Sequence, residues 1–89
     1  MVRLPALSGG DLCRVLEKDG FVLKRQTGSH RIYQKELSEG TITIPVPVHG
    51  SKPLKRGTLH AILKRAGIST QRLAFLGAIL GLISRDWLG

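Results

Sequence analysis

Alternation of apolar and polar or small residues over 41–48 constrains the fold of this chain more than any other feature. The apolar members are Ile42, Ile44, Val46 and Val48. A period of two predicts a strand with one face buried. Pro45 and Pro47 lie on the opposite side, and proline donates no backbone hydrogen bond. We therefore expect this strand to pair fully only up to about Ile44.

Two further strand-forming stretches precede it, residues 21–25 and 30–35, separated by the turn residues 27–29. This pattern predicts a hairpin. The two faces of its second strand carry His30, Ile32 and Gln34 on one side and Arg31, Tyr33 and Lys35 on the other. Each face holds one apolar residue. We expect Ile32 to face the core and His30 to lie at the open end of the strand.

Helices are predicted before and after the three strands in the chain. Ser8 followed by Asp11 is typical of a capping box, which starts a helix over about 9–19. A second helix is expected over 54–66, and Ser69 is expected to cap a third helix that runs to about Arg85. The order is helix, three strands and two helices, an α+β fold with helices on one face of an antiparallel sheet.

The charge of the chain indicates a polyanionic partner. Lys and Arg number 14 against 6 Asp and Glu, a net charge of +8, and residues 20–72 hold ten of the basic and two of the acidic side chains. Nucleic acid is the first candidate. One cysteine, Cys13, excludes an internal disulfide framework, and we expect it to be a buried apolar residue. Three histidines without a carboxylate cluster make a metal site unexpected.

No targeting or membrane segment is expected. The start of the chain lacks the apolar region of a signal peptide, and the longest apolar stretch, 73–83, has eleven residues where a bilayer span needs about 20. These features predict a soluble cytoplasmic protein.

The same apolar stretch predicts a contact surface. A helix there would be hydrophobic around its whole circumference, and a small domain covers only one side of it. Gly77 and Gly81 would allow close backbone approach on the other side. We expect a domain over 1–69 and an apolar helical extension over 70–89, with self-association through 70–88 and a monomeric chain when it ends near Ser69. The alternative is that the segment folds back and hides both sides.

Residues 26–34 hold the candidate catalytic group. His30 follows a small-residue turn and has cations beside it at Lys24, Arg25 and Arg31. RNA supplies its own nucleophile, the 2′-hydroxyl, so a ribonuclease needs only proton transfer and cations that stabilise the transition state. An imidazole titrates near pH 6.5 and can act as acid or base at neutral pH.

Residues in this stretch and further along the chain resemble the motifs of a known family. Gly28 to Tyr33 looks like the Gly-Ser-His-x-x-Tyr/Phe signature of the HicA (YcfA-like) toxins, and the segments 44–50, 57–59 and 62–68 are similar to the second half of that family. The resemblance covers about residues 4–70. It implies a double-stranded-RNA-binding-domain-like fold (α-β-β-β-α), here with an additional C-terminal helix. It also implies ribosome-independent mRNA cleavage (an mRNA interferase of a type II toxin–antitoxin system), a cognate HicB antitoxin and His30 as the catalytic residue.

The chain departs from the family pattern in two features, His60 and the long apolar segment after residue 70. Together, resemblance and chemistry predict a toxin endoribonuclease that cleaves RNA with a single catalytic histidine and needs no metal and no cofactor. The expected RNA contacts are Lys24, Arg25, Ser29, Arg31, Tyr33, Lys52, Lys55 and Arg56. Tyr33 has two alternatives, stacking on a base or packing against the sheet, and a role for His49 stays open. The rival functions are a non-catalytic RNA-binding module and, less favoured, a DNA-binding regulator.

Overall fold

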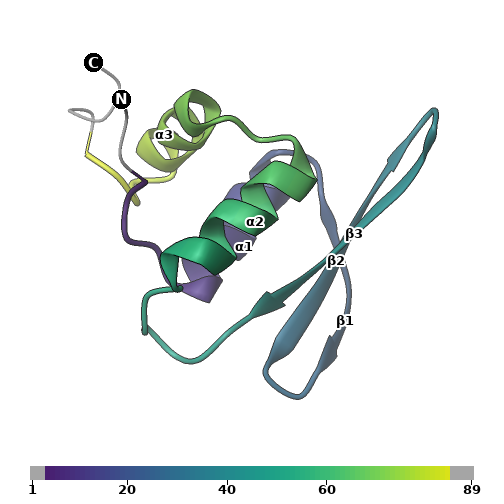
Figure 1. Ribbon diagram of the computed structural model, residues 1–89, viewed down its shortest axis with the longest axis horizontal. Coiled ribbons are helices and arrows are strands. Elements are labelled where there is room, and N and C mark those ends of the chain that lie inside the picture. Colours follow the sequence, from purple (N-terminus) through teal and green to yellow (C-terminus); the bar gives the residue numbers. More distant parts are fainter. Residues whose placement is uncertain (1–3, 85–89) are drawn as a thin grey trace.

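A three-stranded antiparallel sheet with helices on one side forms the molecule (Figure 1). The computed structural model describes residues 4–84. The elements in chain order are α1 (Gly9–Lys18), β1 (Val22–Thr27), β2 (His30–Leu37), β3 (Gly40–Pro47), α2 (Arg56–Ala66) and α3 (Thr70–Ile79). This layout confirms the predicted α+β, double-stranded-RNA-binding-domain-like fold with an extra C-terminal helix.

Strand β3 pairs with β2 along its whole length, from Leu37 opposite Gly40 to His30 opposite Pro47. The prediction that pairing stops near Ile44 is therefore wrong. The strand lies at the edge of the sheet, and Val48 N beyond its end still donates to Ser29 O at 2.6 Å. Even-numbered positions thus direct their N–H groups toward β2, whereas both prolines direct their nitrogens toward the free edge. An edge strand tolerates proline in that orientation.

The core lies between the helices and the face of the sheet that contains Tyr33. Tyr33 is fully buried with Ile44 and Val46, whereas Ile32 is half-buried on the opposite, open face. The expectation that Ile32 faces the core is therefore wrong. The ring of Tyr33 fills the space between the sheet and α1, and its hydroxyl donates to Glu17 Oε2 at 2.5 Å. A tyrosine can be buried in this way when its hydroxyl reaches a polar partner.

The start of α1 confirms the predicted capping box. Ser8 Oγ accepts from Asp11 N at 3.1 Å, and Asp11 Oδ2 accepts from Ser8 N at 3.2 Å. Helix α2 begins two residues later than predicted. Pro53 forms a bridge with Ser8, and Leu54 N donates to Leu7 O at 2.8 Å. These extended contacts hold residues 53 and 54 outside the helix.

Helix α3 is shorter than predicted. Ser69 caps it as expected, but the helix ends at Ile79, and Arg85, the predicted end, lies outside the described residues. The chain turns at Gly81 and brings Ile83 back onto Gly77, where an added Cβ would be 2.2 Å from Ile83 Cδ1. The expectation of close approach by another molecule is therefore wrong for Gly77, which packs against its own chain, whereas an added Cβ at Gly81 would have no atom within 4 Å.

No helix within residues 4–84 is both long enough and apolar enough to cross a membrane.

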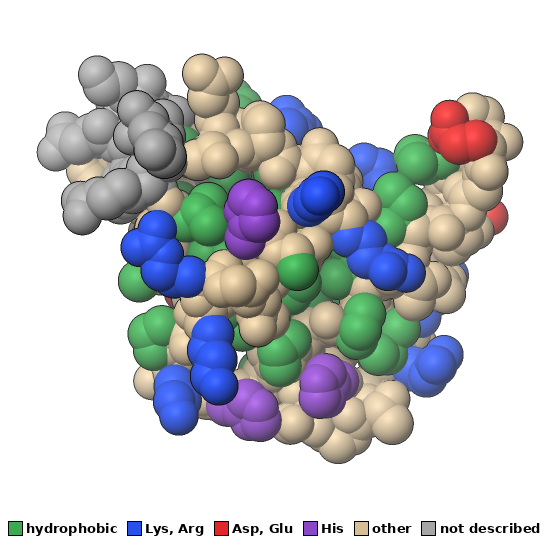
Figure 2. Space-filling view, viewed as in Figure 1, with side chains coloured by type: hydrophobic (Ala, Val, Ile, Leu, Met, Phe, Trp, Pro, Cys, Tyr) green, Lys and Arg blue, Asp and Glu red, His purple; other side chains and the backbone are tan. Residues whose placement is uncertain are grey.

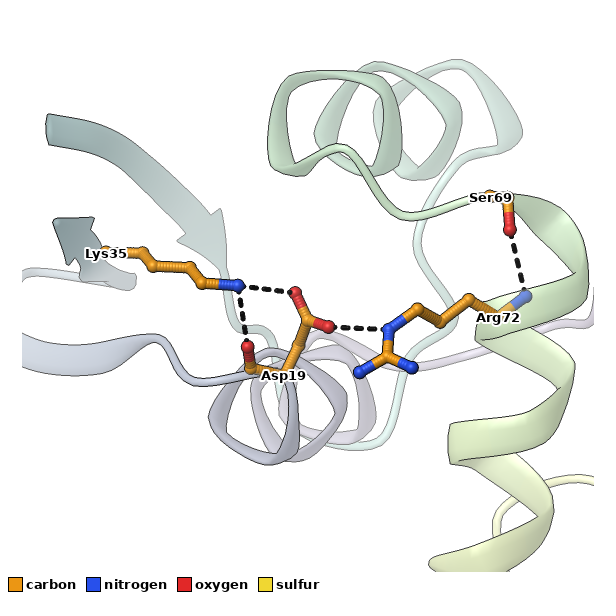
Figure 3. Close-up of polar contacts among 4 residues, drawn as sticks. All are labelled: Asp19, Lys35, Ser69 and Arg72. Atoms are coloured by element: carbon orange, nitrogen blue, oxygen red, sulfur yellow. Dashed lines mark hydrogen bonds and ion pairs between the residues drawn. The ribbon is translucent and has the colours of Figure 1, made fainter. Parts of the chain in front are cut away.

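Asp19, directly after α1, connects three elements (Figure 3). Its carboxylate accepts from Lys35 Nζ of β2 at 3.3 Å and from Arg72 Nε of α3 at 2.8 Å. The ammonium group of Lys35 also donates to the Asp19 carbonyl oxygen at 2.8 Å. With 7% of its side chain exposed, Asp19 holds both cations close to the body of the domain. Lys35 and Arg72 are thus held by a carboxylate, whereas Arg65 donates to the Thr43 carbonyl oxygen at 2.9 Å.

Candidate active site

The turn between β1 and β2 presents His30 to solvent. Thr27 pairs with His30, which leaves Gly28 and Ser29 as a two-residue loop. Gly28 has φ +57°, and Ser29 does not have a positive φ. A glycine with positive φ at the first loop position is typical of a type II′ hairpin turn. His30 is therefore the first residue of β2, exposed at the end of the strand as the sequence predicts.

The open face of the sheet surrounds His30 with residues from three strands. Pro47 lies directly opposite on β3, in the kind of antiparallel pair whose Cα atoms are about 4.5 Å apart. Arg25 of β1 pairs with Ile32, the next residue of β2 on this face. A cation thus lies diagonally across from the imidazole. Lys24 is exposed at an irregularity in the same strand, where the β1–β2 register shifts between Leu23 and Arg25.

Arg31 and Tyr33 lie on the other side of the sheet. Burial raises the pKa of the Cys13 thiol, and hydrogen bonding from the neighbouring Tyr33 and Arg31 acts in the opposite direction. Cys13 belongs to α1, so the Arg31 guanidinium reaches toward the helices rather than toward His30. Tyr33 is enclosed, which leaves neither ring face free to stack on a base. The structure therefore selects the packing alternative for Tyr33.

A pocket of about 520 Å³ opens beside this site, between the end of β3 and the start of α2. Its walls include Pro47, His49, Lys52, Leu54, Lys55 and Thr58. Lys55 is the N-cap residue of α2, Arg56 follows it, and the first turn of the helix contains no acidic residue. The backbone N–H groups at a helix start favour anions. This combination of cations suits phosphate groups.

The acidic side chains of residues 4–84 are used elsewhere. Asp11 caps α1, Glu17 accepts from Tyr33, and Asp19 binds Lys35 and Arg72. The remaining two, Glu36 and Glu39, lie at the far tip of the β2–β3 hairpin, where Figure 2 shows red side chains distant from the histidines at the lower edge. The two ends of the sheet thus differ from each other in charge, and the end that carries His30 is positive.

A metal-binding cluster is not found in the described part of the chain, where no three His, Cys, Asp or Glu side chains group together. An exposed imidazole with neighbouring cations can transfer protons and bind phosphate. The structure brings His30, Arg25 and Ser29 to one end of the sheet. Lys52 and Lys55 line the pocket, and Arg56 follows Lys55 as the first residue of α2. The structure places Arg31 and Tyr33 away from these residues.

The pocket itself is the part of the site that sequence reasoning missed. Thr58 and Leu54 carry no recognisable signal, because their position depends on how α2 packs against β3. His49 did carry a signal. It lies two residues beyond Pro47, which is opposite His30, so continued alternation past the end of β3 puts His49 on the face of His30.

These features define a class of protein: a small, basic α+β domain of the double-stranded-RNA-binding-domain type, with a histidine exposed at one end of its sheet. The sequence model of the HicA toxin of bacterial toxin–antitoxin systems matches residues 9–68. The chain therefore belongs to the HicA toxin family. No curated protein matches the chain. Membership of this family makes the protein a toxin that is paired with an antitoxin.

Proposed function

We propose that this toxin is an endoribonuclease, an mRNA interferase, in which His30 transfers a proton during RNA cleavage. The observation that carries the proposal is the exposure of His30 at the cationic end of the sheet, next to Arg25 and the phosphate-compatible pocket. General acid–base catalysis by a positioned histidine contributes typically about 10² to 10⁴ in rate. This modest acceleration fits a toxin better than a digestive nuclease.

The surrounding cations have two roles in this proposal. Arg25 stabilises the charge that develops on the phosphate during cleavage, and Lys24 and Ser29 bind beside it. Lys52, Lys55 and Arg56 bind flanking phosphates across the pocket. Cationic contacts of this kind position RNA of any sequence. The antitoxin partner, a HicB-like protein, would inhibit the enzyme by covering His30 and these cations.

Expression of the wild type and of His30→Ala in separate cultures tests the assignment. We expect the wild type to arrest growth and degrade bulk mRNA, and His30→Ala to do neither. Because His30 is exposed, the variant keeps its circular dichroism spectrum, its unfolding midpoint and its affinity for RNA. His60→Ala, an exposed histidine on α2, is the matched control and stays toxic.

Two outcomes contradict the proposal. Undiminished mRNA degradation by folded His30→Ala removes His30 from catalysis. A wild type that binds RNA without cleaving it favours the non-catalytic RNA-binding module instead.

The proposed mechanism needs no divalent cation. The acidic side chains within residues 4–84 form no group of three metal ligands, and the two at the β2–β3 tip, Glu36 and Glu39, lie at the opposite end of the sheet from His30. We expect RNA cleavage by the purified toxin to proceed at an unchanged rate in excess EDTA. Loss of cleavage on chelation, restored by added Mg²⁺ or Mn²⁺, would contradict this part of the proposal.

A further inference from the structure

A second histidine lies on the His30 side of the sheet. Val48 N donates to Ser29 O at 2.6 Å, so antiparallel pairing continues one residue beyond β3. Val48 packs against the core, which directs its neighbours Pro47 and His49 away from the core. Both line the same pocket. Figure 2 shows histidine side chains gathered at one edge of the molecule, over the β1–β2 turn and the end of β3.

The end of β3 places His49 close to His30 along the chain. His30 lies opposite Pro47, the last residue of β3, and His49 follows two residues later, after Val48, whose N–H still donates to Ser29 O. If the chain stays extended from Val48 to His49, the Cα atoms of the two histidines are diagonal neighbours, about 7–8 Å apart. Two imidazoles that extend from such positions can contact the two sides of one RNA phosphate, because each has to approach its own oxygen atom only to about 2.6–3.2 Å.

Cleavage of RNA by its own 2′-hydroxyl requires two proton transfers on opposite sides of phosphorus. A base removes the 2′-hydroxyl proton as the 2′-oxygen forms a bond to phosphorus. An acid gives a proton to the 5′-oxygen as the bond between phosphorus and that oxygen breaks. One imidazole cannot reach both oxygens at once, because the attacking and leaving atoms lie in line.

We propose that His49 is the second proton-transfer group, so that His30 and His49 form an acid–base pair. This inference rests on the proposed ribonuclease function. One histidine accepts the 2′-hydroxyl proton, the other donates to the 5′-oxygen, and the products are a 2′,3′-cyclic phosphate and a 5′-hydroxyl end. Atoms and charge balance without water or metal. The pocket beside His49 holds the adjoining nucleotide, with Lys52 and Lys55 on its phosphate, and its volume of about 520 Å³ suits such a ligand.

An RNA with a sulfur atom at the leaving position tests the pair. The cleavage site of an RNA oligonucleotide is first mapped with wild-type toxin made by cell-free synthesis. The same oligonucleotide is then prepared with sulfur in place of the 5′-bridging oxygen at that site. A thiolate leaves without being protonated, so this substrate needs a base but no acid.

We expect His30→Ala and His49→Ala each to cleave the ordinary RNA about 10² to 10⁴ times more slowly than the wild type. On the sulfur-containing RNA, one of the two variants recovers a rate close to that of the wild type, and this variant identifies the acid. The other stays slow on both substrates. His49→Gln, which keeps a polar side chain of similar size, behaves as His49→Ala does. His60→Ala cleaves both RNAs as the wild type does.

Three results overturn the assignment of His49. The first is an unchanged rate for His49→Ala on ordinary RNA. The second is recovery by neither variant, which makes His49 a binding or positioning residue. The third is recovery by both variants. If the wild type cleaves neither RNA, the ribonuclease proposal itself fails. Unfolding midpoints of both His49 variants, compared with that of the wild type, exclude loss of the fold as the cause of a slow rate.

Discussion

Tyr33 of β2 donates its hydroxyl hydrogen to Glu17 of α1 at 2.5 Å, although the tyrosine ring is fully buried in the core. This bond joins the sheet to the first helix. Burial, and next the hydrogen bond to the Glu17 carboxylate, raise the pKa of Tyr33 above its ordinary value near 10. Burial is the larger of these causes. The raised pKa makes the stability of the fold depend on alkaline pH.

The folded protein keeps the Tyr33 proton at pH values where the unfolded chain loses it. The associated stability is therefore fully present below about pH 10 and is lost as the pH rises from there toward the folded pKa. We expect Tyr33→Phe to lower the free energy of unfolding by about 0.5–1.5 kcal/mol at pH 8. Above about pH 10 the free energy of unfolding of the wild type should fall relative to that of the variant by up to about 1.4 kcal/mol per pH unit. Urea unfolding of the wild type and the variant, at pH 8 and above about pH 10, measures this difference in free energy.

The same group can be titrated directly, because Tyr33 is the only tyrosine of the chain. Ultraviolet absorbance should show tyrosinate near pH 10 in urea and only at higher pH in the folded protein. Coincident titrations in the two states would contradict the burial of this hydroxyl.

Gly9 at the start of α1 lies against the end of β3. A Cβ at this position would be 2.1 Å from Pro47 O, so Gly9→Ala forces the backbone of one element to move. We expect a loss of about 1–3 kcal/mol in unfolding free energy. Gly10→Ala is the matched control, because the nearest atom is 3.9 Å away, and it should stabilise the helix by about 0.5–1 kcal/mol. Equal effects of the two substitutions in thermal unfolding would show that Pro47 does not approach α1 this closely.

Lys55 and Arg56 at the start of α2 are expected to contact RNA phosphates. Replacing both by Ala should weaken RNA binding for all sequences and reduce the magnitude of the slope of log K against log salt by about 1.4–1.8. The preferred cleavage site should stay the same. Arg14→Ala with Lys18→Ala removes the same charge from the exposed side of α1 and controls for net charge. If the two double variants have identical slopes, Lys55 and Arg56 make no specific phosphate contact.

Phe75 and Ile79 leave α3 with an apolar face. They are 50% and 52% exposed, whereas Leu73 and Leu76 of the same helix are buried in the core. Self-association through residues 70–88 stays a prediction, now carried by these two side chains, and residues 85–88 lie outside the described range. A chain ending near Ser69 would also remove part of the core, so substitution is the better test. Light scattering should show wild-type oligomers at micromolar concentration and monomers for Phe75→Gln with Ile79→Gln.

Gln71→Ala, an exposed change on the same helix, should leave the oligomers intact. A wild type that is monomeric and monodisperse at this concentration would contradict the predicted association.

Local patterns in the sequence determined the order of the elements and several of their ends. The Ser8–Asp11 capping box and the Ser69 cap are confirmed because a helix start depends on hydrogen bonds between residues three apart in the chain. The turn before His30 is confirmed for a similar reason, since Gly28 meets a backbone requirement within the hairpin. The family is also recognisable from these local motifs.

The tertiary structure decided which side of β2 faces the helices. Ile32 and Tyr33 both suit burial, and the tyrosine is the buried one, packed with Ile44 and Val46 where its hydroxyl reaches Glu17 on α1. This choice moves Arg31 and Tyr33 away from His30 and puts Pro47 on the face of His30. The position of β3 at the sheet edge, which lets Pro45 and Pro47 pair, is likewise a property of the assembled sheet. The sequence determines the local hydrogen bonds and the alternation of apolar and polar residues. Which side chains lie on the same face of the sheet, and so form one site, depends on packing between elements far apart in the chain.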